Sequence, residues 1–275
     1  MTPNRLTKAA QLAATGVIAA LLLTACSPAA PAGQGSDATS TTAPAKPVTL
    51  TVLAAASLTA VFTTIGQQFE SANPGVTVRF SFDGSATLVT QISQGAPADV
   101  VALADTKTMD QLTQANLIAG SPTLFASNSL VLAVPADNPA GITSLTDLTK
   151  AGVKTVVCDS SVPCGAAADR VFTAAGVSVA PVSLESSVTA VVTKLTTGEA
   201  DAGMVYGTDV AGSGGKIVAV PLPDTAAVTQ AAMTSYPIAV VAAAASPDWA
   251  GQFVTFVTSG PGQATLQTAG FGPAS

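Results

Sequence analysis

Runs of residues typical of β-strands alternate with runs typical of α-helices from Val48 almost to the end of the chain. The first strand is predicted over Val48–Leu53, and the first helix over Leu58–Ser71, where apolar residues recur at helical spacing. This alternation predicts an α/β fold with largely parallel sheets. In such sheets, ligands bind beyond the carboxyl ends of the strands. The residues that follow each strand are therefore the first candidates for a functional site.

The same pattern predicts the remaining elements. Further strands are expected over Val76–Phe82, Val100–Ala104, Leu130–Val134, Thr155–Cys158, Ala202–Tyr206, Ile217–Val220 and Ile238–Ala242, and further helices around Leu88–Ile92, Met109–Gln114, Ala166–Ala174, Val188–Thr197, Trp249–Thr258 and Gly262–Thr268.

The first residues have the features of an export signal. Arg5 and Lys8 precede an apolar stretch that is too short to span a bilayer, and small residues then lead to Cys26. The pattern predicts a lipoprotein signal peptide over 1–25, with Cys26 as the acylated residue. A plain signal peptide followed by an incidental cysteine is the alternative. Residues 26–46 are rich in Ala, Pro, Ser, Thr and Gly and are predicted to form a lipid-anchored flexible tether.

The charge balance excludes one class of partner. Without Arg5 and Lys8, 8 basic and 16 acidic residues remain, which gives a net charge of −8. A nucleic-acid-binding protein needs a basic patch, and these scattered basic residues do not supply one. The acidic balance also disfavours long-range attraction of an anion. Any bound anion must therefore be held by local dipoles.

Cys158 and Cys164 remain as a pair once Cys26 is assigned to the lipid. In an exported protein such a pair favours a structural disulfide. Two free thiols are an alternative, and a redox role is a weaker one because the spacing is not C-x-x-C.

Five positions share the same local pattern, in which a strand is followed by a short turn and the start of a helix. Free backbone N–H groups in a first helical turn form a ready site for an anion. Ser57 is expected at an N-cap, where serine is favoured, and Tyr206 would add a phenolic donor. The positions are Ser57, Ser85, Cys164, Val188 and Tyr206.

Each of these signals is weak when taken alone. A serine before a helix is usually only a cap, and a single tyrosine is more often a buried ring with a satisfied hydroxyl. Cys164 is explained by its disulfide. Asp99, Asp105 and Asp209 are expected to cap or brace loops rather than to bind a metal or transfer protons.

Several segments resemble the molybdate-binding proteins of ABC importers, in matching order and spacing along nearly all of Val48–Phe271. They are AAASL at Ala54–Leu58, GAPADVVALAD at Gly95–Asp105, NSLVLAVP at Asn128–Pro135, VPCG at Val162–Gly165 and GMVYGTD at Gly203–Asp209. The resemblance implies a two-lobed type II periplasmic-binding-protein fold, in which each lobe is a mostly parallel sheet flanked by helices. Two hinge strands would join the lobes, which we place at 47–128 plus 237–275 and at 129–236.

The resemblance also implies a ligand and its contacts. Molybdate, and tungstate as well, would be held through its oxygens by the hydroxyl and N–H of Ser57 and Ser85. The backbone N–H groups of Cys164 and Val188 and the hydroxyl of Tyr206 would complete the site, with no direct metal ligand and no cofactor. The protein would be a monomer on the extracytoplasmic face of the bacterial cell membrane, anchored through Cys26, and would deliver the anion to an ABC permease.

Four other functions are weighed against this one. A protein for sulfate or another tetrahedral oxyanion is the closest, and a ferric-complex protein would want more tyrosines or histidines. A serine-dependent hydrolase is a distant alternative, because the chain has no histidine for a Ser-His-Asp triad. A purely structural lipoprotein would explain the tether but not the five strand-to-helix positions. We therefore expect no catalytic residue.

Overall fold

The computed structural model describes residues 47–274. The predicted signal peptide at 1–25, the tether at 26–46 with Cys26, and Ser275 lie outside the described residues. Within 47–274, no helix is both long enough and apolar enough to cross a membrane.

The strands form two mixed sheets that share one long strand. In the first sheet, β2, β1 and β3 are parallel, and the sheet continues antiparallel through β9 to β4. In the second, β7, β5 and β6 are parallel, and β4 pairs antiparallel with both β7 and β8. The strands are β1 (Val48–Ala55), β2 (Val76–Asp83), β3 (Val100–Ala102), β4 (Ile118–Pro135), β5 (Thr155–Cys158), β6 (Ser183–Glu185), β7 (Ala202–Tyr206), β8 (Ile217–Val220) and β9 (Met233–Val241).

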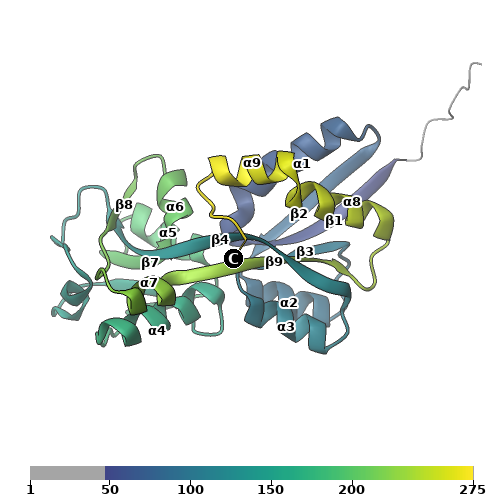
Figure 1. Cartoon of the computed structure of the whole chain (residues 1–275). Helices are drawn as coiled ribbons and strands as arrows, with labels where there is room; N and C mark the ends of the chain where they lie inside the picture. The colour runs from purple at the N-terminus through teal and green to yellow at the C-terminus, as the bar shows by residue number, and fades with distance from the viewer. Residues whose placement is uncertain (1–46, 275) are drawn as a thin grey trace, which may run out of the picture. The chain divides into compact units, whose positions relative to one another are not determined.

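Helices cover both faces of each sheet, with α1, α8 and α9 opposite α2 and α3 on the first sheet (Figure 1). The helical elements are the 3₁₀ turns η1 (Ala56–Leu58) and η2 (Leu145–Thr149), and the α-helices α1 (Thr59–Ala72), α2 (Ser85–Ser93), α3 (Thr106–Gln114), α4 (Pro163–Ala175), α5 (Val188–Thr196), α6 (Gly207–Gly212), α7 (Ala226–Ala232), α8 (Pro247–Thr258) and α9 (Gly260–Thr268).

The apolar face predicted for the first helix packs in the core of the first sheet. Phe62, Ile65 and Phe69 on α1 are almost completely buried. The ring of Phe69 meets that of Phe253 on α8 edge to face, with 5.2 Å between their centroids. Edge-to-face aromatic pairs are favourable beyond the area they bury, so this contact helps to fix α1 and α8 on the same side of the sheet.

The two-lobed α/β fold class is confirmed. Among the elements, β6, α6 and α7 were not predicted, and one predicted strand is longer in the structure. The strand predicted over Leu130–Val134 is the second half of β4, which begins at Ile118. Gly120 and Pro122 are typical of turns, and they are accommodated because the pairing of β4 with β9 shifts register between Ala119 and Thr123. Antiparallel pairs that involve β4 and β9 also contribute more to both sheets than the sequence pattern indicated.

Candidate functional site

A small cavity lies where the strand ends of the two sheets meet. Its empty space is about 200 Å³, part of which is open to solvent. The first sheet contributes residues that follow β1, β2 and β3, and the second contributes the starts of α4 and α5 and the end of β7. The lining residues are Ala55, Ala56, Ser57, Gly84, Ser85, Ala104, Val162, Pro163, Cys164, Val188 and Tyr206.

All five of the residues predicted from sequence line this cavity. Among the described residues, no charged side chain lies in its wall. The position agrees with the general rule that α/β sheets bind ligands beyond the carboxyl ends of their strands. An anion placed here would meet hydroxyl and amide dipoles rather than lysine or arginine.

Three helices begin at the cavity wall. Ser85 is the first residue of α2, Cys164 the second of α4 and Val188 the first of α5. No side chain caps α2 or α4, whereas the side chain of Ser187 accepts from the third residue of α5. First-turn N–H groups have no partner inside their own helix, so those at the cavity are available as donors.

The predicted role of Ser57 as an N-cap is wrong. Ser57 lies inside η1, the helix α1 begins only at Thr59, and Ala55 occupies the N-cap of η1 without a side-chain hydrogen bond. The Ser57 hydroxyl instead lies 3.0 Å from the hydroxyl of Tyr236 on β9. A contact between residues far apart in the sequence thus replaces the local cap that the pattern indicated.

The hydroxyl of Ser85 is held in place from behind. Its oxygen accepts a hydrogen bond of 3.0 Å from the backbone N–H of Ala104, and the residue is almost completely buried. A serine hydroxyl carries one proton and two acceptor lone pairs. Because the oxygen is already used as an acceptor, its proton is available for a ligand in the cavity.

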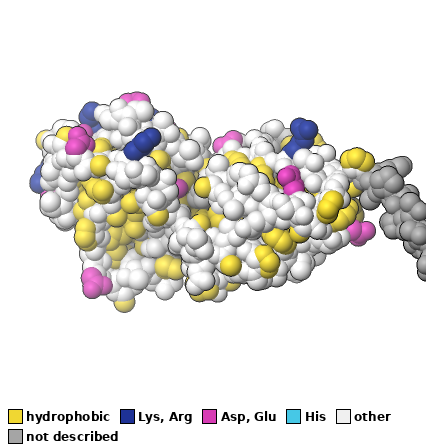
Figure 2. All heavy atoms as spheres, turned by 90° about the horizontal axis from the view of Figure 1, so that it is seen from above, with side chains coloured by type: hydrophobic (Ala, Val, Ile, Leu, Met, Phe, Trp, Pro, Cys, Tyr) yellow, Lys and Arg dark blue, Asp and Glu magenta, His cyan; other side chains and the backbone are white. Residues whose placement is uncertain are grey.

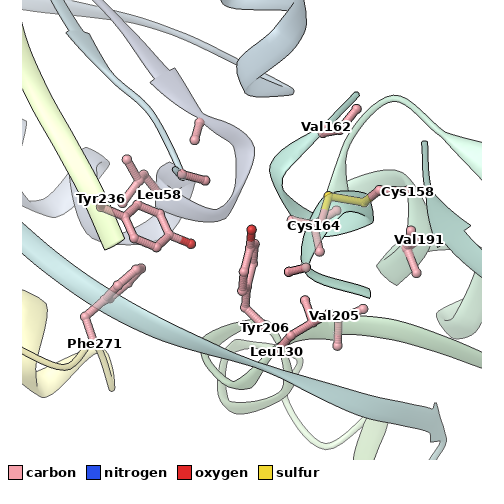
Figure 3. Close-up of a cluster of buried hydrophobic side chains, with 14 of the residues drawn as sticks. Leu58, Leu130, Cys158, Val162, Cys164, Val191, Val205, Tyr206, Tyr236 and Phe271 are labelled. Atoms are coloured by element: carbon pink, nitrogen blue, oxygen red, sulfur yellow. A yellow bond between two sulfur atoms is a disulfide. The ribbon is translucent and has the colours of Figure 1, made fainter. Parts of the chain in front are cut away.

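Tyr206 brings a buried hydroxyl that makes no hydrogen bond of good geometry within residues 47–274, although the Tyr236 side chain lies near it. Burial raises the pKa of its phenol well above the ordinary value, and the nearby Tyr236, Asp209 and Asp105 act in the same direction. The group therefore remains a neutral donor. Figure 3 shows the Tyr206 hydroxyl pointing into the space between the two sheets, with Tyr236 on the side of the first sheet. A buried polar group without a partner is uncommon and calls for a ligand or water.

A disulfide joins Cys158 at the end of β5 to Cys164 in the first turn of α4, with 5.7 Å between their Cα atoms (Figure 3). The turn between them is tight, because a Cβ atom on Gly165 would overlap the carbonyl oxygen of Asp159. The disulfide thus fixes the segment that carries the Cys164 N–H at the cavity.

Three aspartates act as braces, as the sequence analysis expected. Asp99 accepts from the backbone N–H groups of Thr51 at 2.8 Å and Ser246 at 2.9 Å. Asp105 caps α3, and Asp209 accepts from the N–H of Tyr206 at 2.9 Å. Among the described residues, no group of three or more His, Cys, Asp or Glu side chains could hold a metal ion.

Sequence reasoning missed Gly84 and Tyr236. A Cβ atom on Gly84 would overlap the carbonyl oxygen of Ser186, which follows β6 in the other sheet. Tyr236 stands behind Ser57. Each contact joins two residues that are more than one hundred positions apart in the sequence, so no local sequence pattern predicts it.

Comparison with known proteins places the chain in a family. It matches the bacterial extracellular solute-binding proteins over residues 50–272. It is 45% identical over 261 residues to the molybdate-binding protein ModA of Mycobacterium tuberculosis (strain ATCC 25618 / H37Rv), covering 94% of this chain and 96% of that relative.

Two solved structures share the fold with equal TM-scores of 0.69. The periplasmic molybdate-binding protein of Azotobacter vinelandii is 22% identical, covering 82% of this chain and 100% of its own. The sulfate-binding protein SubI of Mycobacterium tuberculosis H37Rv is 20% identical, covering 82% of this chain and 87% of its own. At these identities the two structures show the fold and not the ligand. The chain belongs to the bacterial extracellular solute-binding proteins and is a binding protein, not an enzyme.

Proposed function

We propose that the protein captures molybdate in this cavity for an ABC importer. One observation carries the proposal: neutral donors from both sheets converge on one small cavity, and the buried Tyr206 hydroxyl in its wall makes no hydrogen bond within residues 47–274. Ser57 and Ser85 would donate through hydroxyl and N–H, and Cys164 and Val188 through N–H. A tetrahedral oxyanion accepts several hydrogen bonds at once, and each bond to a charged partner contributes about 1.5–3 kcal/mol.

Sulfate is the second candidate, because it has the same tetrahedral arrangement of oxygens and because SubI shares the fold. The 45% identity to a molybdate-binding protein, over almost the whole chain, favours molybdate. Selection between molybdate and sulfate would rest on size. Molybdate is the larger anion and would fill the cavity and reach donors on both sheets. Tungstate is close to molybdate in size and charge, so we propose that it also binds.

The proposal extends to where the protein acts. After cleavage of the signal peptide, acylation of Cys26 would hold the protein on the extracytoplasmic face of the bacterial membrane, with 26–46 as a tether. More than one acyl chain is needed for stable anchoring. The protein would act as a monomer and present the loaded cavity to a membrane permease.

We propose lobes at 47–128 plus 237–275 and at 129–236. The support is the pairing of β4, which faces β9 up to Ser129 and β7 from Leu130 onwards. Each lobe would then contribute one wall of the cavity, and binding would draw the two walls together.

A thermal-shift panel tests the choice of ligand, because a ligand that binds only the folded state raises the unfolding midpoint by mass action. The panel contains molybdate, tungstate, sulfate, phosphate and ferric citrate at equal concentration. We expect a rise with molybdate and tungstate alone. An equal or larger rise with sulfate would favour the second candidate, and no rise with any oxyanion would contradict both.

A further inference from the structure

Tyr236 stands one layer behind the cavity wall. It lies on β9 and is fully buried, and its hydroxyl is 3.0 Å from Ser57 Oγ. Its ring is enclosed by aromatic neighbours, with centroid distances of 5.5 Å to Phe271, 6.1 Å to Tyr206 and 6.2 Å to Phe125. These contacts leave the phenol little freedom to turn away from Ser57.

The two serines of the cavity have matching support. Ser85 Oγ accepts from the N–H of Ala104 at 3.0 Å, and Ser57 Oγ lies at the same distance from the Tyr236 hydroxyl. A backbone N–H can only donate, so the direction of the first bond is fixed. The second bond can run either way, because both of its partners are hydroxyls.

A bound anion would determine which of the two hydroxyls, Ser57 or Tyr236, donates in this hydrogen bond. It offers only acceptors, so the Ser57 hydroxyl must turn its single proton toward the ligand, and the proton between the two oxygens must then come from Tyr236. Burial raises the pKa of the Tyr236 phenol, so the group keeps its proton at neutral pH. A hydroxyl that accepts a hydrogen bond while donating another is also a stronger donor.

We propose that Tyr236 is a positioning residue that donates its phenolic proton to Ser57 Oγ and so holds the Ser57 hydroxyl as a donor toward the bound oxyanion. This inference rests on the proposed function and deepens it, since Tyr236 does not line the cavity itself. Each serine hydroxyl of the site then has its own donor behind it.

A double-mutant cycle in the full chain tests the proposal, with molybdate titrated by calorimetry. Tyr236→Phe keeps the ring and removes the hydroxyl, and we expect it to weaken molybdate binding roughly 3- to 10-fold, the range of one ordinary hydrogen bond. In a Ser57→Ala background, the same change should weaken binding less than about 2-fold, because the group that it positions is gone. Equal losses in both backgrounds, or no loss in the first, would overturn the proposal.

Ser127→Ala is the matched control. Ser127 is a buried serine on β4 whose hydroxyl donates to the carbonyl of Pro273, outside the cavity. The Tyr236→Phe loss should be the same with and without this change. If the cycle with Ser127 shows as much coupling as the cycle with Ser57, Tyr236 acts through general packing and the proposal fails.

A spectroscopic test leaves Tyr236 in place. The chain has two tyrosines, so in Tyr206→Phe protein the tyrosine absorption comes from Tyr236 alone. Saturating molybdate should shift that absorption to longer wavelength, because the Tyr236 phenol then donates its proton to Ser57 Oγ. Ser57→Ala should abolish the shift. A spectrum that does not change would overturn the role of Tyr236. Failure of the unsubstituted protein to bind molybdate would instead overturn the proposed function.

Discussion

Gly84→Ala should impair binding while leaving the fold intact. Gly84 precedes α2 with φ −60° and ψ 139°, which any residue adopts without strain. The glycine is therefore required for space and not for backbone freedom. An added Cβ would overlap the carbonyl oxygen of Ser186 and lie 3.1 Å from its carbonyl carbon and 3.6 Å from Val162 Cγ1. Ordinary carbon–oxygen contacts begin at about 3.3 Å, so the two sheets must separate at this point.

The magnitude follows from the cost of overpacking a close contact, which is about 1–3 kcal/mol. If the cavity must be closed to hold molybdate, that cost appears in the affinity, and Kd rises roughly 5- to 150-fold. Without ligand the two segments can move apart. The unfolding free energy should then change by less than about 1 kcal/mol, as expected for alanine at a compatible backbone position.

Calorimetric titration with molybdate and thermal unfolding without ligand together measure the two effects. Gly251→Ala on α8 is the control, because a Cβ there meets nothing within 4 Å, and it should leave Kd unchanged. Unchanged affinity of Gly84→Ala would show that binding does not require this close approach. A large loss of ligand-free stability would show that the contact serves the fold instead.

Three further predictions concern Tyr206 and Cys164 in the cavity wall and the residues bonded to them. Tyr206→Phe should weaken molybdate binding by about 1–3 kcal/mol without lowering the ligand-free unfolding midpoint, because no internal hydrogen bond is lost; unchanged affinity by calorimetry would remove Tyr206 from the site. Burial raises the pKa of Asp209 from 3.8 to about 7, against the opposing hydrogen bond from the Tyr206 N–H. The folded protein then holds a proton that the unfolded chain releases near 3.8, so the unfolding free energy should fall as pH rises from about 4 to about 7. Chemical denaturation across this range should show the fall, and Asp209→Asn should flatten it; an equal slope in the variant would contradict the assignment. Replacing both Cys158 and Cys164 with serine should cost about 2–2.5 kcal/mol of stability through loop-closure entropy, and non-reducing mass spectrometry should show the two cysteines joined, whereas freely alkylatable thiols would contradict the disulfide.

Local patterns were sufficient to predict the strand-to-helix positions. Ser85, Cys164 and Val188 follow strands and open helices in the structure as predicted, because a strand end followed by a helix start is encoded over a few neighbouring residues. The same reasoning failed at Ser57, where the hydroxyl bonds to a residue 179 positions away. It also failed for most of β4 before Leu130, whose turn-like residues are held in a strand by pairing with β9.

The convergence of the five residues on one cavity depended on the family resemblance and not on periodicity. Periodicity indicates which faces are buried, but it does not indicate how two sheets approach each other. The contact of Gly84 with Ser186 and the layer formed by Tyr236 behind Ser57 arise from that approach. They were therefore visible only in three dimensions.

Anomalous scattering at the molybdenum absorption edge would locate molybdenum in crystals of the protein grown with molybdate. We predict one molybdenum per chain in the cavity between the two sheets, with its oxygens within hydrogen-bond distance of the Ser57, Ser85 and Tyr206 hydroxyls and of the Cys164 and Val188 N–H groups. A peak outside this cavity, or an empty cavity at saturating molybdate, would contradict the proposed binding site.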